Sequence, residues 1–263
     1  MTRAVAAAGV ELAVDERGSG DAVVLIHDTA GSRTLWRETV SELGWDVRTI
    51  AYDRRGYGDS EAPVPYEGTT VAEQADDLAA LIEALDAAPA LLVGSGLGAL
   101  VALDVMLHRR ELTRGAVLIK PPLLWLSPHG PEVVGELRDA IEAGARDGGP
   151  GGAVDAWLTA VAGPGALASY GPERVESARA STRAFAADLS AGPSWGATRR
   201  ELRSLARPVT IVTSRGGGAI WHEVAVQLGE LLPHGRLVEL EAGHLAPIEA
   251  SGALADEIRA LLA

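Results

Sequence analysis

The sequence predicts an α/β fold, with one domain built on a mostly parallel, doubly wound sheet and a helical insertion. Three observations lead to this prediction. Short apolar runs alternate with segments of helical length, which is typical of parallel strands joined by crossover helices. Strand-like runs are missing between Pro121 and Pro193, where helical segments and glycine-rich breaks occur instead. The 263 residues, 47% of them hydrophobic, are enough to bury one large core without disulfides or metals.

The first part of the chain supplies most of the predicted strands. Residues 10–14 alternate weakly, as an edge strand does, whereas the next apolar runs are continuous and predict buried strands. Thr70 is a suitable N-cap for a helix with apolar residues on one face, and Pro121-Pro122 ends the last strand of this part. We therefore predict strands at residues 10–14, 22–26, 47–51, 90–93 and 115–119, and helices at residues 34–43, 71–85 and 97–108.

The second part of the chain predicts the insertion and the end of the sheet. The insertion consists of helical stretches at residues 131–145, 153–161 and 172–189, with strands at 209–212 and 236–240 and helices at 221–232 and 252–262 after it. Glycines at 148–152 make a flexible break within the insertion. We assign residues 1–120 and 197–263 to an α/β core and residues 121–196 to a helical lid.

Composition limits the partners and the location that we expect. The 36 acidic and 23 basic residues give a formal charge of −13, which repels nucleic acid and anionic lipid surfaces. Cysteine is absent, which excludes disulfides and a cysteine nucleophile. The sequence contains no apolar run of membrane-spanning length and no apolar leader segment. We expect a cytoplasmic protein with a small-molecule substrate and no nucleic acid or membrane partner. The sequence does not decide the oligomeric state, and a homodimer is one of the alternatives.

Four segments resemble landmarks of the α/β-hydrolase family, in the order and at the spacing found there. Residues 23–31 resemble the strand and His-Gly loop, with Asp28 where glycine is usual. Residues 52–60 resemble the Asp-x-Arg-Gly-x-Gly-x-Ser loop, whose charged groups are mainly structural. Residues 92–100 resemble the nucleophile elbow, and residues 241–245 resemble the segment that carries the catalytic histidine. The resemblance covers almost the whole chain and implies an α/β-hydrolase fold.

The nucleophile elbow of this chain differs from the family pattern at its central residue. Glycines lie two residues before and two residues after Gly96, as the sharp turn requires, so the resemblance implies that Gly96 stands at the nucleophile position. Ser95 lies one residue early, where its side chain points in another direction, and it is interpreted as a small residue that forms hydrogen bonds near the elbow. The resemblance also implies that backbone amides of Asp28 and Leu97 form the oxyanion hole.

The acid of a Ser-His-acid triad is also missing at its expected positions. The strand at residues 209–212 is followed by Thr-Ser-Arg-Gly-Gly-Gly, which contains no carboxylate. Some relatives take the acid from a Glu-Pro-Pro sequence after the strand that follows the elbow helix, and here that sequence is Lys120-Pro121-Pro122. The chain thus resembles an atypical family member that keeps a histidine, His244, without the serine nucleophile.

Three ionisable residues are the catalytic candidates. His244 is favoured as a general acid or base, because an imidazole titrates near neutral pH. Lys120 is the single lysine of the chain, and burial at a strand end would lower its pKa and suit it to acid, base or Schiff-base roles. A structural ion pair between Lys120 and Asp28 is the alternative. Asp28 itself is expected to orient His244, bind a polar substrate group or hold its own turn.

Aromatic residues near the loops that border the predicted pocket are the substrate-binding candidates. Trp125 and Trp221 suit an apolar or ring-bearing substrate, although core packing explains a tryptophan equally well. His129 lies where the lid begins. The metal spacing His-Glu-x-x-His and a phosphate-binding glycine loop with lysine are both absent, so we expect no metal and no cofactor. The candidates for substrate contacts are Trp36, Trp125, His129 and Trp221.

Three functions remain open from the sequence. The leading hypothesis is a cofactor-independent lyase, isomerase or cyclase that performs isomerisation, cyclisation, elimination or C–C cleavage on a small organic molecule, with His244 as general acid or base. Atypical family members in secondary metabolism suggest a biosynthetic substrate by analogy. The second hypothesis is a residual hydrolase that uses Ser95 or a water activated by His244. The third is a ligand-binding protein that keeps the pocket without catalysis.

Overall fold

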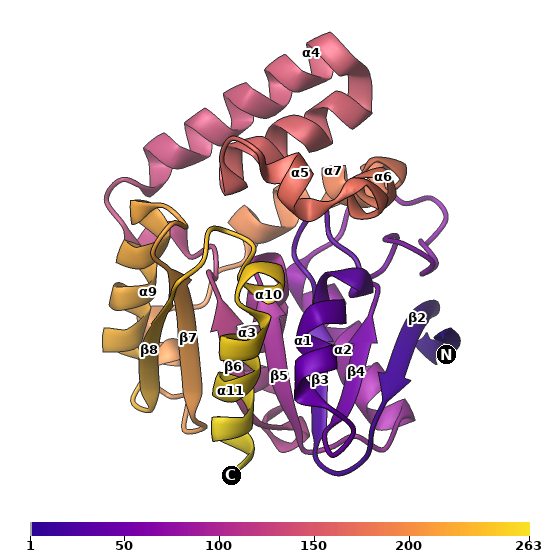
Figure 1. Cartoon of the computed structure of the whole chain (residues 1–263), viewed down its shortest axis with the longest axis vertical. Coiled ribbons are helices and arrows are strands. Elements are labelled where there is room, and N and C mark those ends of the chain that lie inside the picture. Colours follow the sequence, from indigo (N-terminus) through magenta and orange to yellow (C-terminus); the bar gives the residue numbers. More distant parts are fainter. Residues whose placement is uncertain (1) are drawn as a thin grey trace.

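The computed structural model describes residues 2–263 and contains an eight-stranded sheet in the order β1-β2-β4-β3-β5-β6-β7-β8 (Figure 1). The β1–β2 and β2–β4 pairs are antiparallel, and all other neighbouring pairs are parallel. The mostly parallel, doubly wound sheet predicted from the sequence is therefore confirmed. The strands are β1 (Thr2–Ala7), β2 (Val10–Arg17), β3 (Ala22–Ile26), β4 (Arg48–Tyr52), β5 (Ala90–Ser95), β6 (Thr113–Ile119), β7 (Val209–Ser214) and β8 (Gly235–Leu240).

The continuous apolar runs occur in strands that are buried on both faces. Successive side chains of a strand point to opposite sides of the sheet. Val24 and Leu92 accordingly belong to one core cluster, and their neighbours Val23 and Leu91 belong to the other. Helices on both sides of the sheet favour apolar residues at every position of these strands, and β3 and residues 90–93 of β5 are continuous apolar runs.

Helices cover both faces of the sheet (Figure 1). On one face α2 (Val71–Ala84) packs against α3 (Leu97–His108), and α9 (Ala219–Leu231) adds to the same core cluster. On the other face α1 (Arg37–Leu43) packs against α11 (Ser251–Leu262). Within the described residues no helix has the length and apolarity needed to cross a bilayer. The short helices are η1 (Arg33–Trp36), η2 (Arg110–Leu112), η3 (Leu124–Leu126), α8 (Arg199–Leu202) and α10 (Ala246–Glu249).

Four helices between β6 and β7 lie over the carboxyl ends of the strands (Figure 1). We call them the cap: α4 (Gly130–Ala162), α5 (Ala166–Tyr170), α6 (Pro172–Ala180) and α7 (Thr182–Ser194). The α4 helix bends back on itself at Gly148 and Gly149, and the φ of 64° at Gly149 lies in the left-handed region that glycine tolerates best. The predicted helices 131–145 and 153–161 are therefore the two arms of α4. The division of the chain into core and lid at residues 121 and 196 stays a prediction.

Candidate active site

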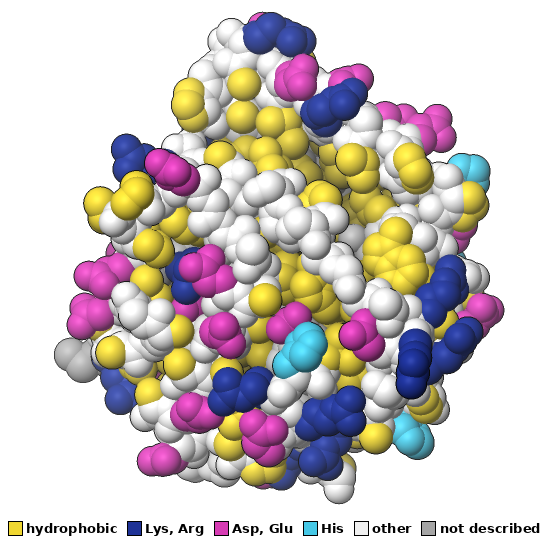
Figure 2. Space-filling view, turned by 180° about the vertical axis from the view of Figure 1, so that it is seen from behind, with side chains coloured by type: hydrophobic (Ala, Val, Ile, Leu, Met, Phe, Trp, Pro, Cys, Tyr) yellow, Lys and Arg dark blue, Asp and Glu magenta, His cyan; other side chains and the backbone are white. Residues whose placement is uncertain are grey.

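A cavity of about 760 Å³ lies between the carboxyl ends of the strands and the cap. Its wall is mainly apolar, and Figure 2 shows hydrophobic side chains gathered below the uppermost part of the molecule, where α4 lies. Charged groups enter it at the strand ends, from Asp28 after β3 and Lys120 after β6. The apolar wall includes Leu97, Leu100, Leu123, Leu124, Trp125, Val134, Leu137, Ile141, Trp157, Val161, Leu189, Pro193, Trp195 and Trp221.

The turn from β5 into α3 brings the backbone close to neighbouring elements. Gly96 connects the two elements with φ 51° and ψ −120°, and its N–H donates to the carbonyl of Ile119 at 2.9 Å. A Cβ atom on Gly94 would overlap the carbonyl of Gly98, and one on Gly98 would overlap the carbonyl of Ile26. The glycines on either side are thus required by close packing, which agrees with the sharp strand-to-helix turn predicted from the sequence.

The Asp28 carboxylate fills the space beside Gly96. Its Oδ1 accepts hydrogen bonds from the backbone N–H groups of Thr29, at 2.6 Å, and Leu97, at 2.9 Å. A Cβ atom added to Gly96 would overlap all three terminal atoms of this carboxylate. The sequence implied that the amide of Asp28 pairs with that of Leu97 in an oxyanion hole. That assignment was wrong, because the two converging amides belong to Thr29 and Leu97 and bind the Asp28 side chain itself.

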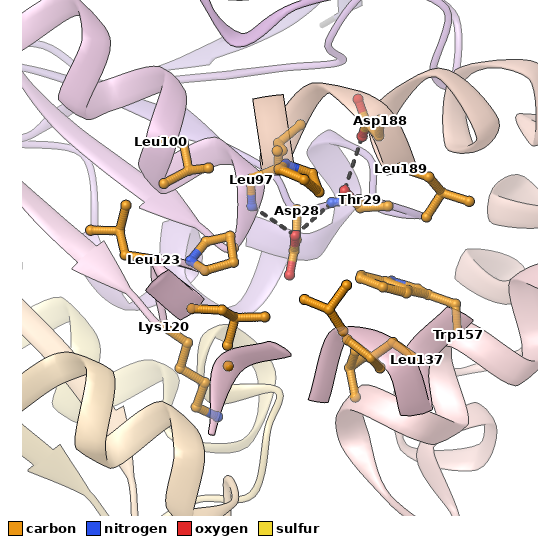
Figure 3. Close-up of a pocket in the computed structure, with 18 of the residues that line it drawn as sticks. Asp28, Thr29, Leu97, Leu100, Lys120, Leu123, Leu137, Trp157, Asp188 and Leu189 are labelled. Carbon is orange, nitrogen blue, oxygen red and sulfur yellow. Dashed lines mark hydrogen bonds between the residues drawn. The ribbon is translucent and has the colours of Figure 1, made fainter. Parts of the chain in front are cut away.

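The second oxygen of Asp28 faces the cavity. Figure 3 shows Oδ1 at the two dashed hydrogen bonds and the other oxygen pointing into the space that the drawn side chains enclose. No residue in the range 2–263 donates a hydrogen bond to this Oδ2. Burial raises the pKa of the Asp28 carboxyl, whereas the bonds from Leu97 and Thr29 oppose that rise. The result is a half-buried carboxylate with one oxygen held by two hydrogen bonds and one oxygen available to the cavity.

The Lys120 side chain is buried and bound to backbone rather than to Asp28. Its Nζ donates to the carbonyl oxygens of Gly243 at 2.8 Å and His244 at 2.9 Å, and Figure 3 shows the Nζ end pointing away from the Asp28 carboxylate. A direct Lys120–Asp28 ion pair, the structural alternative predicted from the sequence, is not formed among the described residues. Burial lowers the pKa of Lys120 to about 7, and the negative charges of Glu249 and Asp28 oppose this effect.

The His244 ring lies at the same end of the sheet, packed edge-on against Trp221 with 5.8 Å between ring centroids. Its Nδ1 is buried, and no described residue forms a hydrogen bond with it. Burial, together with the nearby charge of Lys120, lowers the pKa of His244 to about 3, so the ring is neutral at pH 7. His244 and Ser95 both line a small second cavity of about 30 Å³, and Ser95 does not line the large one.

The aromatic candidates divide into two groups. Trp125 and Trp221 line the large cavity, which is compatible with their predicted contact with a substrate. That contact stays a prediction. Trp36 does not line it, because the side chain is fully buried in the core cluster beneath α1 and α11. His129 is exposed at the start of α4 and also lies outside the cavity wall. The expectation that these last two residues border the pocket was therefore wrong.

The cavity residues that the sequence analysis did not name include two from the cap with a large aromatic ring or a charge. Trp157 comes from the second arm of α4, and Asp188 comes from α7. The Asp188 side chain is buried and bonded to Arg54 of the loop at residues 52–60. The family pattern had assigned that loop a structural role, but the sequence contained no signal for its acidic partner. Among residues 2–263 no cluster of three His, Asp or Glu side chains could hold a metal ion.

A comparison with family models matches residues 23–257 of the chain to the alpha/beta hydrolase family. A thermophilic esterase from Thermogutta terrifontis has a similar structure, with a TM-score of 0.81 and 25% identity over 100% of this chain and 98% of the other. An enol-lactonase from Burkholderia xenovorans superposes with a TM-score of 0.77 at 21% identity, over 99% of each chain. At such identities the likeness establishes a common fold.

Sequence relatives give shorter matches. An epoxide hydrolase of Caballeronia sordidicola is 32% identical over 121 residues, which is 46% of this chain and 37% of the relative. A 2-(acetamidomethylene)succinate hydrolase of Mesorhizobium japonicum is 31% identical over 144 residues, 54% of this chain and 48% of the relative. The chain thus spans less than half the length of these curated relatives. Both are named hydrolases.

Proposed function

Because this chain belongs to the α/β-hydrolase family, we propose that it is an atypical, cofactor-free member in which Gly96 replaces the nucleophile and the Asp28 carboxylate performs the chemistry. The proposed reaction is a non-hydrolytic proton transfer, within an isomerisation, cyclisation, elimination or C–C cleavage of a small, mainly apolar molecule. One observation carries the proposal. The Asp28 carboxylate fills the space where a side chain of residue 96 would lie, and it accepts the hydrogen bonds of the two amides that converge there.

Serine-type acyl transfer does not fit this arrangement. Glycine has no nucleophilic atom, and acyl transfer needs free N–H donors for the oxygen that becomes negative in the transition state. Here the N–H groups of Thr29 and Leu97 already bind a carboxylate oxygen. A substrate oxyanion would have to displace the Asp28 carboxylate or lie against its negative charge. Both alternatives disfavour the tetrahedral intermediate of ester hydrolysis.

Asp28 has the properties of a general base. Its free oxygen faces the cavity, and burial raises the pKa of the carboxyl toward the range where proton transfer at neutral pH is efficient. In the proposed step the carboxylate takes a proton from the substrate and becomes a carboxylic acid, while the electron pair of the broken bond stays in the substrate. Proton return from Asp28 to another atom of the same molecule completes an isomerisation and restores the carboxylate.

The two other ionisable candidates differ in what their pKa values allow. With a pKa near 3, His244 is a weaker proton acceptor than the sequence suggested and weaker than Asp28, whose pKa is raised above its ordinary value of 3.8. With a pKa near 7, Lys120 exists partly as an ammonium ion at neutral pH and is suited to stabilise or protonate an oxygen that gains charge. The four tryptophans in the wall favour a ring-bearing apolar substrate: Trp125, Trp157, Trp195 and Trp221.

Hydrolysis is the second candidate, because the epoxide hydrolase and the 2-(acetamidomethylene)succinate hydrolase with matching sequence are both named hydrolases. In this version Asp28 or His244 activates a water molecule, or Ser95 reacts from the small cavity that it shares with His244. A ligand-binding protein without catalysis is the third candidate. It predicts that ligands bind the large cavity equally well before and after Asp28→Asn and that neither form turns them over.

Restoring a serine provides the main test of the proposal. We expect the parent chain to resist a fluorophosphonate probe and to leave p-nitrophenyl esters intact. Gly96→Ser alone should not be labelled, because its Cβ would collide with Asp28. The double variant Asp28→Gly/Gly96→Ser frees both the space and the two amides, so it should become labelled at the new serine. Labelling is measured by intact-mass and peptide mass spectrometry.

The control variant for this experiment is Ser95→Ala. If the parent is labelled and Ser95→Ala is not, Ser95 is a nucleophile and the chain is a serine hydrolase after all. If the double variant stays unlabelled although it folds and binds ligands as the parent does, Gly96 does not stand at the nucleophile position.

With a substrate from a screen of apolar carbonyl compounds, Asp28→Asn should reduce turnover by at least about 100-fold.

A further inference from the structure

Asp188 belongs to the cap, but its hydrogen-bond partners all belong to the core. Its Oδ1 accepts from Arg54 Nη1 and Gln74 Nε2, both at 3.1 Å. Its Oδ2 accepts from Arg54 Nη2 and the Tyr57 hydroxyl, both at 2.7 Å, and from the Thr29 hydroxyl at 3.0 Å. The Asp188 side chain is buried. This single cap residue therefore gathers donors from three separate segments of the core.

Thr29 connects this network to the reacting carboxylate. Its Oγ1 donates to Asp188, and its backbone N–H donates to Asp28 Oδ1 at 2.6 Å. Figure 3 shows Thr29 between the two acids, with one dashed bond on each side. Because the hydroxyl and the N–H belong to the same residue, a displacement of the Thr29 backbone that weakens one bond also moves the donor of the other.

Of the other polar contacts between cap and core, the Tyr170 hydroxyl of α5 donates to the carbonyl of Ala30 at 3.2 Å, next to Thr29, whereas the ion pairs of α6 lie away from the site. Arg37 of α1 pairs with Glu173 of α6, and both side chains are more than half exposed. Arg174, whose side chain is largely buried, pairs with the partly exposed Glu38 between the same two helices. These pairs hold α6 against α1, and neither touches the large cavity. Asp188 is thus the cap carboxylate whose bonds lead to Asp28.

We infer that Asp188 is a positioning residue that fixes the orientation of Asp28 through Thr29, so that seating of α7 on the core and alignment of the reacting carboxylate are coupled. This inference rests on the role proposed for Asp28. A substrate that enters between the cap and the strand ends contacts the Asp188 side of the cavity, where α7 also contributes Leu189 and Gly192. Movement of α7 on binding would then adjust the angle of the Asp28 carboxylate.

The coupling is tested at Thr29, because removal of Asp188 would leave Arg54 buried without a partner. Thr29→Val keeps the shape of the side chain and removes the hydroxyl, whereas Thr29→Ser keeps the hydroxyl. The readout is the pH at which the Asp28 carboxyl titrates, followed by NMR of the carboxyl carbon and assigned with Asp28→Asn. Glu173→Gln, which removes the exposed cap-core pair, is the control.

In Thr29→Val the backbone N–H is no longer held in place by the bond to Asp188 and stabilises the charged form less, so Asp28 should titrate at a pH higher by about one unit. Thr29→Ser and Glu173→Gln should titrate as the parent does. Equal titration in Thr29→Val and the parent would overturn the inference and leave Asp188 as a structural anchor of the cap. Failure of the proposed function is a separate result, since it requires unchanged turnover in Asp28→Asn whatever the titration shows.

Discussion

Two carboxylates lie on either side of Thr29, the buried Asp188 and the half-buried Asp28, and their surroundings differ. Asp188 accepts five hydrogen bonds from four side chains, two of them from the guanidinium of Arg54. Asp28 accepts two, both from backbone amides and both at one oxygen. Among the described residues no cation lies in direct contact with Asp28, and its second oxygen faces the cavity. The charge of Asp188 is balanced by a cation and by hydrogen bonds at both oxygens, whereas Asp28 has no cation within residues 2–263 and hydrogen bonds at one oxygen only.

This difference separates a structural role from a chemical one. A buried charge that is paired and fully hydrogen-bonded holds elements together and is costly to disturb. A buried charge with incomplete compensation has a shifted pKa and an unused acceptor, which are properties of groups that react. Changes in the Asp188 network should therefore alter folding most, and changes at Asp28 should alter chemistry most. Stability measurements on matched variants can test this contrast.

The largest expected effect follows removal of Arg54. Arg54→Leu keeps a side chain of similar length but leaves the Asp188 carboxylate buried without its cation. Breaking a buried ion pair in this way typically lowers the free energy of unfolding by about 3–5 kcal/mol. Urea denaturation followed by circular dichroism measures the loss. Arg37→Leu removes an exposed cap-core pair and should lower stability by less than about 1 kcal/mol. Equal losses in both variants would contradict the structural role of Asp188.

A smaller effect is expected at Tyr57. Its hydroxyl donates to Asp188 Oδ2 at 2.7 Å, and its ring packs edge-on against His27 with 5.1 Å between centroids. Tyr57→Phe keeps the ring and removes one donor, while Asp188 keeps its bonds to Arg54. A hydrogen bond to a charged group is worth about 1.5–3 kcal/mol, and the loss in unfolding free energy should lie near the lower end. No loss at all would mean that the network tolerates missing donors.

Much of the fold could be predicted from the sequence because its strongest signals are local. Unbroken apolar runs gave β3, β5 and β6, and glycine spacing gave the turn at Gly96. β1 was missed, since it is an edge strand whose residues are mostly exposed and small. Asp28, Gly96, Lys120 and His244 line one cavity because each follows a strand at the carboxyl edge of a parallel sheet, where ligand sites form.

The details of the site depended on side-chain directions and on long-range contacts. The Asp28 carboxylate turns toward the amides of Thr29 and Leu97 because Gly96 leaves space there. No local sequence pattern predicts this orientation. The hydroxyl of Thr29 meets Asp188 across 159 positions of sequence, on a cap helix where an acidic residue ordinarily suggests a solvated face. Trp36 was placed at the pocket because its loop leads there, but its side chain turns into the core.

The smallest expected effect on folding is a gain in stability at Asp28. Burial raises the pKa of this carboxyl in the folded chain above its ordinary value of 3.8. The folded state therefore binds the proton more tightly than the unfolded state. Stability from this group is fully present below pH 3.8 and is lost as pH rises through the folded-state pKa. At pH 7 the ionised Asp28 opposes folding.

Asp28→Asn removes this opposing charge and keeps an oxygen that can accept from Thr29 and Leu97. We expect the variant to be more stable than the parent at pH 7, by about 0.5–2 kcal/mol, as is common when a functional group that opposes folding is replaced. The difference should vanish as the pH falls below 3.8, because the parent carboxyl is then neutral in both states. Urea denaturation at several pH values measures it, with exposed Asp139→Asn as the control. If Asp28→Asn were less stable than the parent at pH 7, Asp28 would belong with Asp188 among the residues that hold the fold together.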